Sequence, residues 1–400
     1  MASTQTNFDA TREAAEPTTT GCLLVCLTAL PVNALEIGLA NLALAFPEEN
    51  VLVATPDVAP DISSGGPLRV VSYPAAASAN ASWTLTAGDY LNAAKLVEEH
   101  QATTCLLLGA ESHTLQPEAI RSLATAGTSR DLALARYDLG PHEGLVNSAI
   151  LYPITRALFG VSARFPLAID LCLSQRMTSR MAATAHRFAS VNQSDSLVWP
   201  VIEAASANYS ITETRVGTRG LPQPMPSDLN ALLGLVAGSL FAEIDAKASF
   251  WQRARSPQPN YMPLPDVALA ESPADVTSLI ESFRLAYTNL QEIWSLILPP
   301  NSLLGLKRLY TSPTAGFNMP DSLWARIVYD FALAYRLRTI NRSHLLGALT
   351  PLYLAWAASH LILTSNSITP EQHIQEQAIV FETEKPYLVS RWRWPDRFNP

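Results

Sequence analysis

The sequence predicts an α/β domain with a mostly parallel sheet, followed by a mainly helical C-terminal domain. In the N-terminal part, short apolar runs alternate with segments of helical apolar spacing, which is typical of parallel sheets. From about Asp228 onward strand signals stop, and apolar residues recur at helical spacing, as between Leu323 and Tyr335. At 400 residues the chain exceeds the size at which a single core stops growing, so two domains are expected.

The predicted elements follow in order along the chain. Each predicted strand is a short apolar run bounded by turn residues, such as Gly21 before the first strand and Pro56 after the second. Strands are predicted at 22–28, 51–54, 69–72 and 104–108, and helices at 34–45 and 89–100. In the C-terminal part, Pro320 suits the first turn of a helix, and Pro299 and Pro300 are expected to stop the preceding helix.

These signals divide the chain into three parts. We expect a disordered tail at 1–20, a nucleotide-sugar α/β domain at 21–227 and a helical domain at 228–400. The tail lacks the charged and apolar regions of a signal peptide, and a cytoplasmic location is expected. The Pro-rich stretch 256–273 is predicted to be an extended connection between helical segments.

Composition excludes some partners. Only 16% of the residues are charged and the net charge is -8, so no basic field exists that would attract nucleic acid or an anionic membrane. The segment 345–363 is apolar but contains Pro351 and His360, and we predict a buried helix and no membrane span. The four cysteines lie in apolar runs without CxxC spacing and are expected to be buried and reduced.

Familiar catalytic signatures are absent: the chain has no P-loop, no GxGxxG after a strand, no GxSxG and no HExxH. Ligands of parallel sheets bind beyond the carboxyl ends of the strands, which directs attention to Asp57 and to the loop 109–113. A cluster of polar residues also stands within apolar sequence between 109 and 170. Its members are Glu111, His113, Tyr137, Asp138, His142, Glu143, Asn147, Arg164 and Asp170.

Two carboxylates of this cluster allow two interpretations each. Glu111 ends an apolar strand, where it could hold a cation or a sugar hydroxyl, or be a solvated loop residue. Asp170 lies in an apolar run, where a lone acid is costly unless it is paired. Arg164 is the predicted partner, either in a structural ion pair or in a pair that grips substrate.

The stretch 141–160, PHEGLVNSAILYPITRALFG, followed by Arg164-Phe-Pro-Leu-Ala-Ile-Asp170, resembles the central motif of retaining GT-A glycosyltransferases. The members it is most similar to are the glucosyl-3-phosphoglycerate, glucosylglycerate and mannosylglycerate synthases. The segment 115–120 resembles the one after the family's DXD motif, and Val216-Gly-Thr-Arg219 resembles its LGVR. The resemblance spans roughly residues 20 to 390, and its motifs are specific only around 141–170.

Three departures from the family pattern concern the metal. The DXD position reads Gly109-Ala110-Glu111, the metal-binding histidine after LGVR is missing, and the GGD segment reads Ala168-Ile169-Asp170. In the family the metal neutralises the leaving diphosphate. We therefore expect no tightly bound cofactor and at most weak binding of Mg²⁺ or Mn²⁺ at Glu111. Replacement of the metal by cationic side chains is one hypothesis, with Arg164, His142, Arg219 and Arg215 as candidates.

The resemblance implies a retaining hexosyltransferase that moves a hexose from a nucleoside diphosphate sugar to a small polar, glycerate-like acceptor, and it implies a homodimer. The expected catalytic residues are Asp170, Glu143, His142 and Arg164. The expected substrate-binding residues are Asp57, Glu111, Asn147, Tyr137 and Arg219. Because three metal-associated positions are lost together, a catalytically inactive relative with a binding or regulatory role is the alternative, and a metal-independent enzyme with a changed reaction is a third interpretation.

Overall fold

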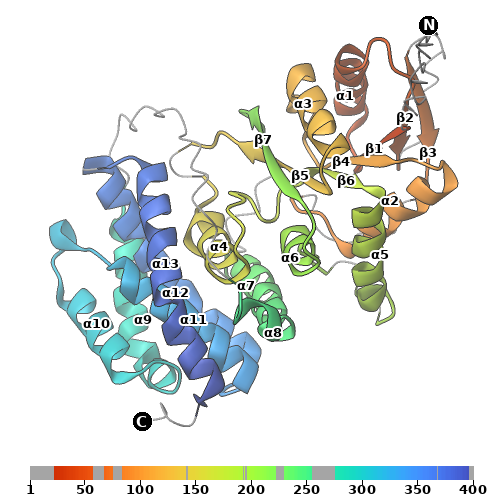
Figure 1. Cartoon of the computed structure of the whole chain (residues 1–400). Helices are drawn as coiled ribbons and strands as arrows, with labels where there is room; N and C mark the ends of the chain where they lie inside the picture. Colours follow the sequence, from red (N-terminus) through yellow and green to blue (C-terminus); the bar gives the residue numbers. More distant parts are fainter. Residues whose placement is uncertain are drawn as a thin grey trace, which may run out of the picture.

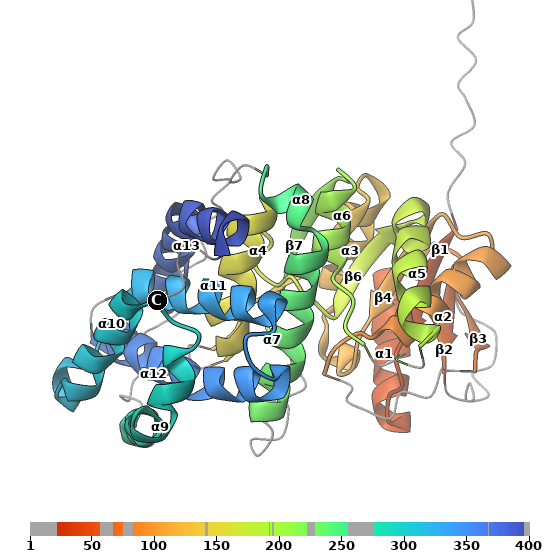
Figure 2. The ribbon, with the colours of Figure 1, turned by 90° about the horizontal axis from the view of Figure 1, so that it is seen from below.

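The computed structural model of the chain describes residues 22–56, 67–74, 83–140, 143–191, 193, 196–221, 229–254, 275–366 and 368–395. Within these residues, an α/β part built on one sheet leads into a mainly helical part (Figure 1, Figure 2). This arrangement confirms the predicted architecture, in which a mostly parallel α/β domain precedes a helical domain. The predicted tail at 1–20 and the predicted connection at 256–273 lie outside the described residues.

The sheet has seven strands in the order β3-β2-β1-β4-β6-β5-β7. Strand β6 is antiparallel to both of its neighbours, β4 and β5, and every other neighbouring pair is parallel. The strands are β1 Leu23–Leu27, β2 Val51–Thr55, β3 Leu68–Ser72, β4 Thr104–Leu108, β5 Leu132–Tyr137, β6 Asp170–Ser174 and β7 Ile211–Gly217. Strands β2 and β5 are buried at every residue, as expected for a sheet covered on both faces.

The four predicted strands are present as β1 to β4, with ends that differ by at most one residue. The two predicted helices are also present, as α1 Val32–Ala45 and α2 Ala87–Glu99. Helix α2 starts earlier than predicted because Thr86 and Asp89 form a capping box, in which the Asp89 carboxylate accepts the Thr86 N–H at 2.8 Å. Strands β5 to β7 are not among the predicted strands, and β7 is a half-buried edge strand with polar residues.

Helices cover both faces of the sheet (Figure 1). On one face α1 packs beside α3 Pro117–Thr128, and on the other α2 packs against α5 Gln175–Ala189. The short helix α6 Pro200–Ser206 contacts β5 and β7. The apolar core of this part therefore lies on both sides of the central strands.

The ion pair of Asp131 joins three elements at the start of β5. Its carboxylate accepts hydrogen bonds from the Ser210 N–H at 2.8 Å and the Ser210 hydroxyl at 2.7 Å, ahead of β7. The Arg176 guanidinium of α5 binds the same carboxylate and holds the pKa of Asp131 below its usual value. This carboxylate thus connects β5, the segment before β7 and α5.

The helical part packs around a second large core, which reaches back into the expected α/β domain. Its helices are α7 Leu229–Ala246, α8 Ala248–Trp251, α9 Thr277–Ser295, α10 Pro300–Thr311, α11 Asp321–Leu337, α12 Arg342–Asn366 and α13 Pro370–Arg393. Helix α4 Tyr152–Phe159 belongs to this core and lies against α13 (Figure 1). The buried Trp324 indole N–H, for example, donates to the Ala149 carbonyl at 2.8 Å.

The prolines of this part act mainly at helix starts. Pro320 directly precedes α11, next to the predicted position, and Pro300 is the first residue of α10. The prediction that Pro299 and Pro300 stop the preceding helix is wrong, because α9 already ends at Ser295. A proline fits the first helical turn, where its missing N–H has no intrahelical partner to lose.

Two helices of the described chain are long and apolar enough to cross a membrane by length and composition, α7 and α12. In α12, which contains the predicted buried helix at 345–363, 67% of the most apolar window is buried within the protein, against 39% in α7. Leu349 and Leu352 of α12 are completely buried. Helix α12 therefore has the burial of a core helix, and the lack of a membrane span stays a prediction.

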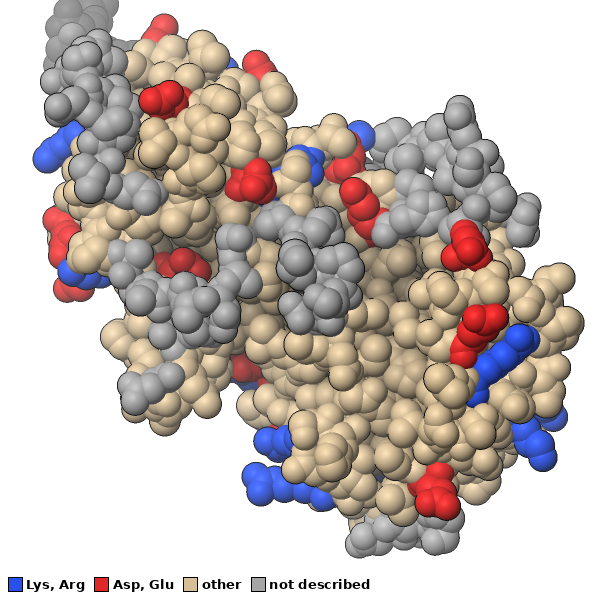
Figure 3. All heavy atoms as spheres, turned by 180° about the vertical axis from the view of Figure 1, so that it is seen from behind, with Lys and Arg blue, Asp and Glu red and all other residues tan. Residues whose placement is uncertain are grey.

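The cysteines match the prediction except at one position. Cys26, Cys105 and Cys172 are buried and free, whereas Cys22 is exposed because it precedes β1. On the face shown in Figure 3, Lys and Arg are scattered among uncharged residues and do not gather into one patch. The absence of a nucleic-acid partner remains a prediction from the composition.

Candidate functional site

The carboxyl ends of β4 and β5 lie at the same edge of the sheet. Because β6 runs antiparallel between these two strands, its first residue lies at that edge too, and Asp170 pairs with Leu108 at the end of β4. Tyr137 is the last residue of β5. The chain leaves β1 toward β2 on one side and returns to β4 on the other, so this edge contains a topological switch point, where open α/β sheets bind ligands.

Asp170, Arg219 and Tyr137 form a closed network at this edge. The Arg219 Nε lies 2.7 Å from Asp170 Oδ2, and its Nη2 donates to Asp170 Oδ1 at 3.0 Å. The Tyr137 hydroxyl donates to Asp170 Oδ2 at 3.0 Å and accepts the backbone N–H groups of Ile169 and Asp170, each at 3.1 Å. The Gly109 N–H donates to Asp170 Oδ1 at 3.2 Å. The carboxylate is thus bound from three sides.

This network is buried, which decides what it can do. The side chains of Asp170 and Arg219 are both 0% exposed. Burial raises the pKa of Asp170, and the neighbouring Arg219 charge counteracts that rise. Arg219 also donates to the Ala110 carbonyl at 2.6 Å and the Gly220 carbonyl at 2.9 Å. Arg219 therefore holds the loop after β4, and contact of either charge with a substrate would require the ion pair to open.

The predicted pairing of Asp170 with Arg164 is wrong. Arg164 instead binds Glu371 of α13 through Nε at 3.1 Å, and its Nη2 donates to the Ser148 hydroxyl at 3.0 Å. Its guanidinium also lies over the Phe165 ring at 5.2 Å. Closeness in sequence favoured Arg164, but β7 delivers the distant Arg219 to the same edge as Asp170. Arg164 thus connects the segment before β6 with the helical part.

Gly109 stands where the resemblance places the first aspartate of DXD, and the structure shows why this position is glycine. A Cβ on Gly109 would lie 2.8 Å from Ile169 Cβ and 2.9 Å from the Ile169 carbonyl oxygen. Contacts this short force atoms to shift. The resemblance places a glycine of the GGD segment at Ile169. The Ile169 side chain, just before β6, therefore fills the space next to position 109. A carboxylate side chain at position 109 has no room there.

The remaining carboxylate of that segment, Glu111, is a poor metal ligand by its surroundings. Its backbone is left-handed, with φ of 60°, and its side chain is 47% exposed. The nearest titratable partner is His113, whose Nε2 lies 3.6 Å from Glu111 Oε2. Among the described residues, no three His, Cys, Asp or Glu side chains come together as a metal site. The described residues therefore do not fit a divalent cation held by several protein ligands.

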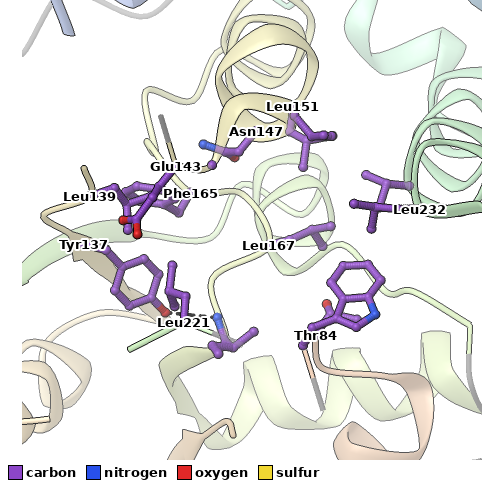
Figure 4. A pocket seen from close by; sticks show the side chains of 15 residues that line it. Thr84, Tyr137, Leu139, Glu143, Asn147, Leu151, Phe165, Leu167, Leu221 and Leu232 are labelled. Atoms are coloured by element: carbon purple, nitrogen blue, oxygen red, sulfur yellow. Dashed lines mark hydrogen bonds between the residues drawn. The ribbon is translucent and has the colours of Figure 1, made fainter. Parts of the chain in front are cut away.

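A pocket opens next to the buried network, between the sheet edge and the helical part (Figure 4). Its volume is about 170 Å³. Tyr137 and Glu143 line one side, and Leu232 of α7 lines the opposite side. Asn147 lines it from the π-helical turn Asn147–Leu151 that precedes α4. The structure thus brings together three predicted site residues, Tyr137, Glu143 and Asn147.

The polar groups of this pocket are partly held by the protein itself. Glu143 lies on an exposed loop, and its Oε2 accepts the Gly140 N–H at 2.9 Å. The Asn147 Nδ2 donates to the Arg164 carbonyl at 2.9 Å, which leaves its Oδ1 as the atom that can accept from a ligand. Phe165 lies edge to face with Tyr137, with ring centroids 5.0 Å apart. The pocket wall on this side is therefore fixed before any ligand binds.

Two predicted site residues, Asp57 and His142, lie outside the described residues, and their roles stay predictions. Arg215, a candidate replacement for the metal, pairs with Asp138 at 2.7 Å on the surface. Glu111 does not line the described pocket. The structure thus separates the predicted set into a buried network, a pocket and an exposed loop.

Sequence reasoning missed the residues that close the pocket. Trp83 precedes α2, Leu221 follows β7, and Leu232 and Val236 lie on α7. These are apolar residues in apolar surroundings, and no spacing marks them as ligand contacts. Only the packing of α7 beside the sheet edge assigns them to the pocket.

A comparison with known protein families finds no match, and neither does a search of curated protein sequences. Among solved structures, the chain is similar to glucosyl-3-phosphoglycerate synthase from Mycobacterium tuberculosis in complex with phosphoglyceric acid, with 14% identity and a TM-score of 0.35, covering 56% of this chain and 80% of that chain. The same synthase with Mn²⁺, UDP-glucose and phosphoglyceric acid matches with 14% identity and a TM-score of 0.37, at the same coverage. We draw no function from these low scores.

Proposed function

We propose that this chain is a glycosyltransferase that binds a nucleoside diphosphate sugar at the carboxyl edge of its sheet and transfers a hexose to a hydroxyl group. One observation carries the proposal. Residues between 143 and 169, within the segment 141–170 whose sequence resembles the central motif of retaining GT-A transferases, line a pocket at the carboxyl end of β5 in a mostly parallel sheet. The resemblance and the pocket therefore converge on the same residues.

In this proposal the protein acts mainly by positioning. The acceptor hydroxyl would lie within reach of Glu143 and of the Asn147 Oδ1, at the pocket wall that Tyr137 fixes. Its oxygen bonds to the anomeric carbon of the hexose as the bond from that carbon to the diphosphate breaks. The electron pair leaves with the nucleoside diphosphate, and Glu143 takes up the hydroxyl proton. Asp170 and Arg219 support this site from behind, because both are buried.

A second candidate, a non-catalytic protein that binds a sugar or nucleotide, is favoured by a specific observation. Arg164, Arg215 and Arg219 are the arginines predicted as replacements for the metal at the leaving diphosphate, and all three are held in ion pairs. A transferase without a firmly held metal needs another positive charge at that place. His142 is then the remaining candidate of the predicted set.

A thermal-shift screen separates the two candidates. The purified protein is heated with UDP-, GDP- or ADP-sugars, each with Mg²⁺, Mn²⁺ or EDTA. A ligand that binds only the folded state adds about 2.7 kcal/mol at one hundred times its dissociation constant, which raises Tm measurably. A shift that survives EDTA supports a metal-independent donor site, and release of the free nucleoside diphosphate with an acceptor establishes transfer. The absence of a shift with every donor would refute the proposed donor site.

Two further expectations belong to this proposal. A homodimer is expected from the resemblance, and light scattering at micromolar concentration would contradict it by giving the mass of one chain, 43.4 kDa. A cytoplasmic location is also proposed, and the buried free thiols of Cys26, Cys105 and Cys172 are compatible with a reducing compartment. It is tested by locating the tagged full-length chain in cell fractions.

A further inference from the structure

The pocket at the sheet edge is apolar over most of its wall. Its apolar side chains come from both parts of the chain and include Trp83, Phe165, Leu167 and Ile169 beside the sheet, and Leu232 and Val236 on α7. Figure 4 shows Leu232 on the side of the cavity opposite Tyr137 and Leu139, with Leu167 between them. A ligand that fills this cavity therefore exchanges its contacts with water for contacts with apolar side chains over most of its surface.

The polar groups of the pocket are few and carry no positive charge. The polar groups of the described lining are the Trp83 indole N–H and the side chains of Thr84, Tyr137, Glu143 and Asn147, and the lining contains no lysine or arginine. The Tyr137 hydroxyl is already occupied by Asp170 and by two backbone N–H groups. The polar groups that remain for a ligand are one carboxylate, one amide oxygen, one threonine hydroxyl and one indole N–H.

The segments that adjoin the pocket in sequence contribute few side chains that could carry a positive charge. The segments 75–82 and 222–228, which adjoin the pocket residues Trp83 and Leu221 in sequence, contain no lysine or arginine. The segment 141–142 adds only His142. A carboxylate or phosphate placed in the pocket would face Glu143 without a compensating arginine or lysine, which is unfavourable in a mostly apolar cavity.

We propose that this pocket binds an uncharged alcohol with an alkyl or aryl body, with the body against α7 and the hydroxyl toward Glu143 and Asn147. This inference rests on the proposed function, in which the alcohol is the hexose acceptor. It differs from the glycerate-like acceptor that the resemblance implies, because a glycerate carboxylate needs a cation and glycerate leaves the apolar wall uncovered. The pocket thus selects acceptors whose alkyl or aryl body is buried against its apolar wall. One or two hydrogen bonds then orient the acceptor hydroxyl.

The test uses the full-length protein and three probes: hexan-1-ol, hexanoate and glycerate. Binding is measured by calorimetry without any nucleotide sugar, so that the result does not depend on whether the protein transfers a sugar. Hexan-1-ol is expected to bind at least about tenfold more tightly than hexanoate, since the two share one body and differ in charge. Tighter binding of hexanoate or glycerate than of hexan-1-ol would overturn the proposal, and so would the absence of hexan-1-ol binding.

A charge variant of α7 then locates the site. Leu232→Lys places a cation in the pocket wall and is expected to reverse the preference from hexan-1-ol to hexanoate. Leu235→Lys is the matched control, because Leu235 lies on the same helix, is 45% exposed and does not line the pocket. Leu232→Ala, which adds no charge, is expected to weaken hexan-1-ol binding. An unchanged preference in a folded Leu232→Lys protein would show that the alcohol binds elsewhere.

The two proposals fail separately. If hexan-1-ol binds and no nucleotide sugar does, the alcohol pocket stands and the transferase is refuted. If a nucleotide sugar binds and hexan-1-ol does not, the transferase stands and the inferred acceptor class is wrong.

Discussion

Removing one partner of the Asp170–Arg219 ion pair should destabilise the sheet edge strongly. Both side chains are 0% exposed, and two Arg219 nitrogens lie 2.7 and 3.0 Å from the carboxylate oxygens. Deleting one partner of such a pair leaves the other charge buried and costs about 3–5 kcal/mol. We expect Asp170→Asn and Arg219→Met each to lower the local opening free energy by that amount. The double variant should lose less than the sum of the two single variants.

Native-state hydrogen exchange measures this quantity at individual amides. The Gly109 N–H is a direct reporter because it donates to Asp170, and the amides of β4 and β6 report on the strands around it. Arg215→Met is the control, since it breaks an ion pair at the end of the neighbouring strand whose arginine is 47% exposed. That loss should stay below about 1 kcal/mol. If the buried and the exposed variants cost the same, the reasoning from burial is refuted.

Three other predictions concern stability. Asp131 has a pKa held below its usual value by an ion pair, so its stabilising contribution is complete above about pH 4 and is lost as the pH falls further; Asp131→Asn should therefore flatten the fall of Tm between pH 5 and pH 2. Gly109→Ala should cost about 1–3 kcal/mol, because its Cβ would lie 2.8 Å from Ile169, and an unchanged Tm would contradict this. Glu203→Gln should lower Tm, because Glu203 is 2% exposed and lies 2.7 Å from Lys247; a Tm within error of the native value would argue against it.

The local pattern of the sequence was enough for the fold class and the first four strands. Short apolar runs between turn residues are typical of strands in a covered sheet, and this is a property of each segment by itself. The same reasoning directed attention to 109–170, because polar residues within apolar runs have to be paired or used. Tyr137, Glu143 and Asn147 were found in this way, and the structure places them in one pocket.

The tertiary structure decided which residues meet. The sequence favoured Arg164 as the partner of Asp170, but the antiparallel β6 and the return of the chain to β7 bring Arg219 there instead. The close approach of Gly109 to Ile169 and the apolar pocket wall from α7 are likewise contacts between distant segments. Burial and spacing within a segment set its secondary structure. The choice among distant partners depends on how all segments pack together, and only the folded chain contains that information.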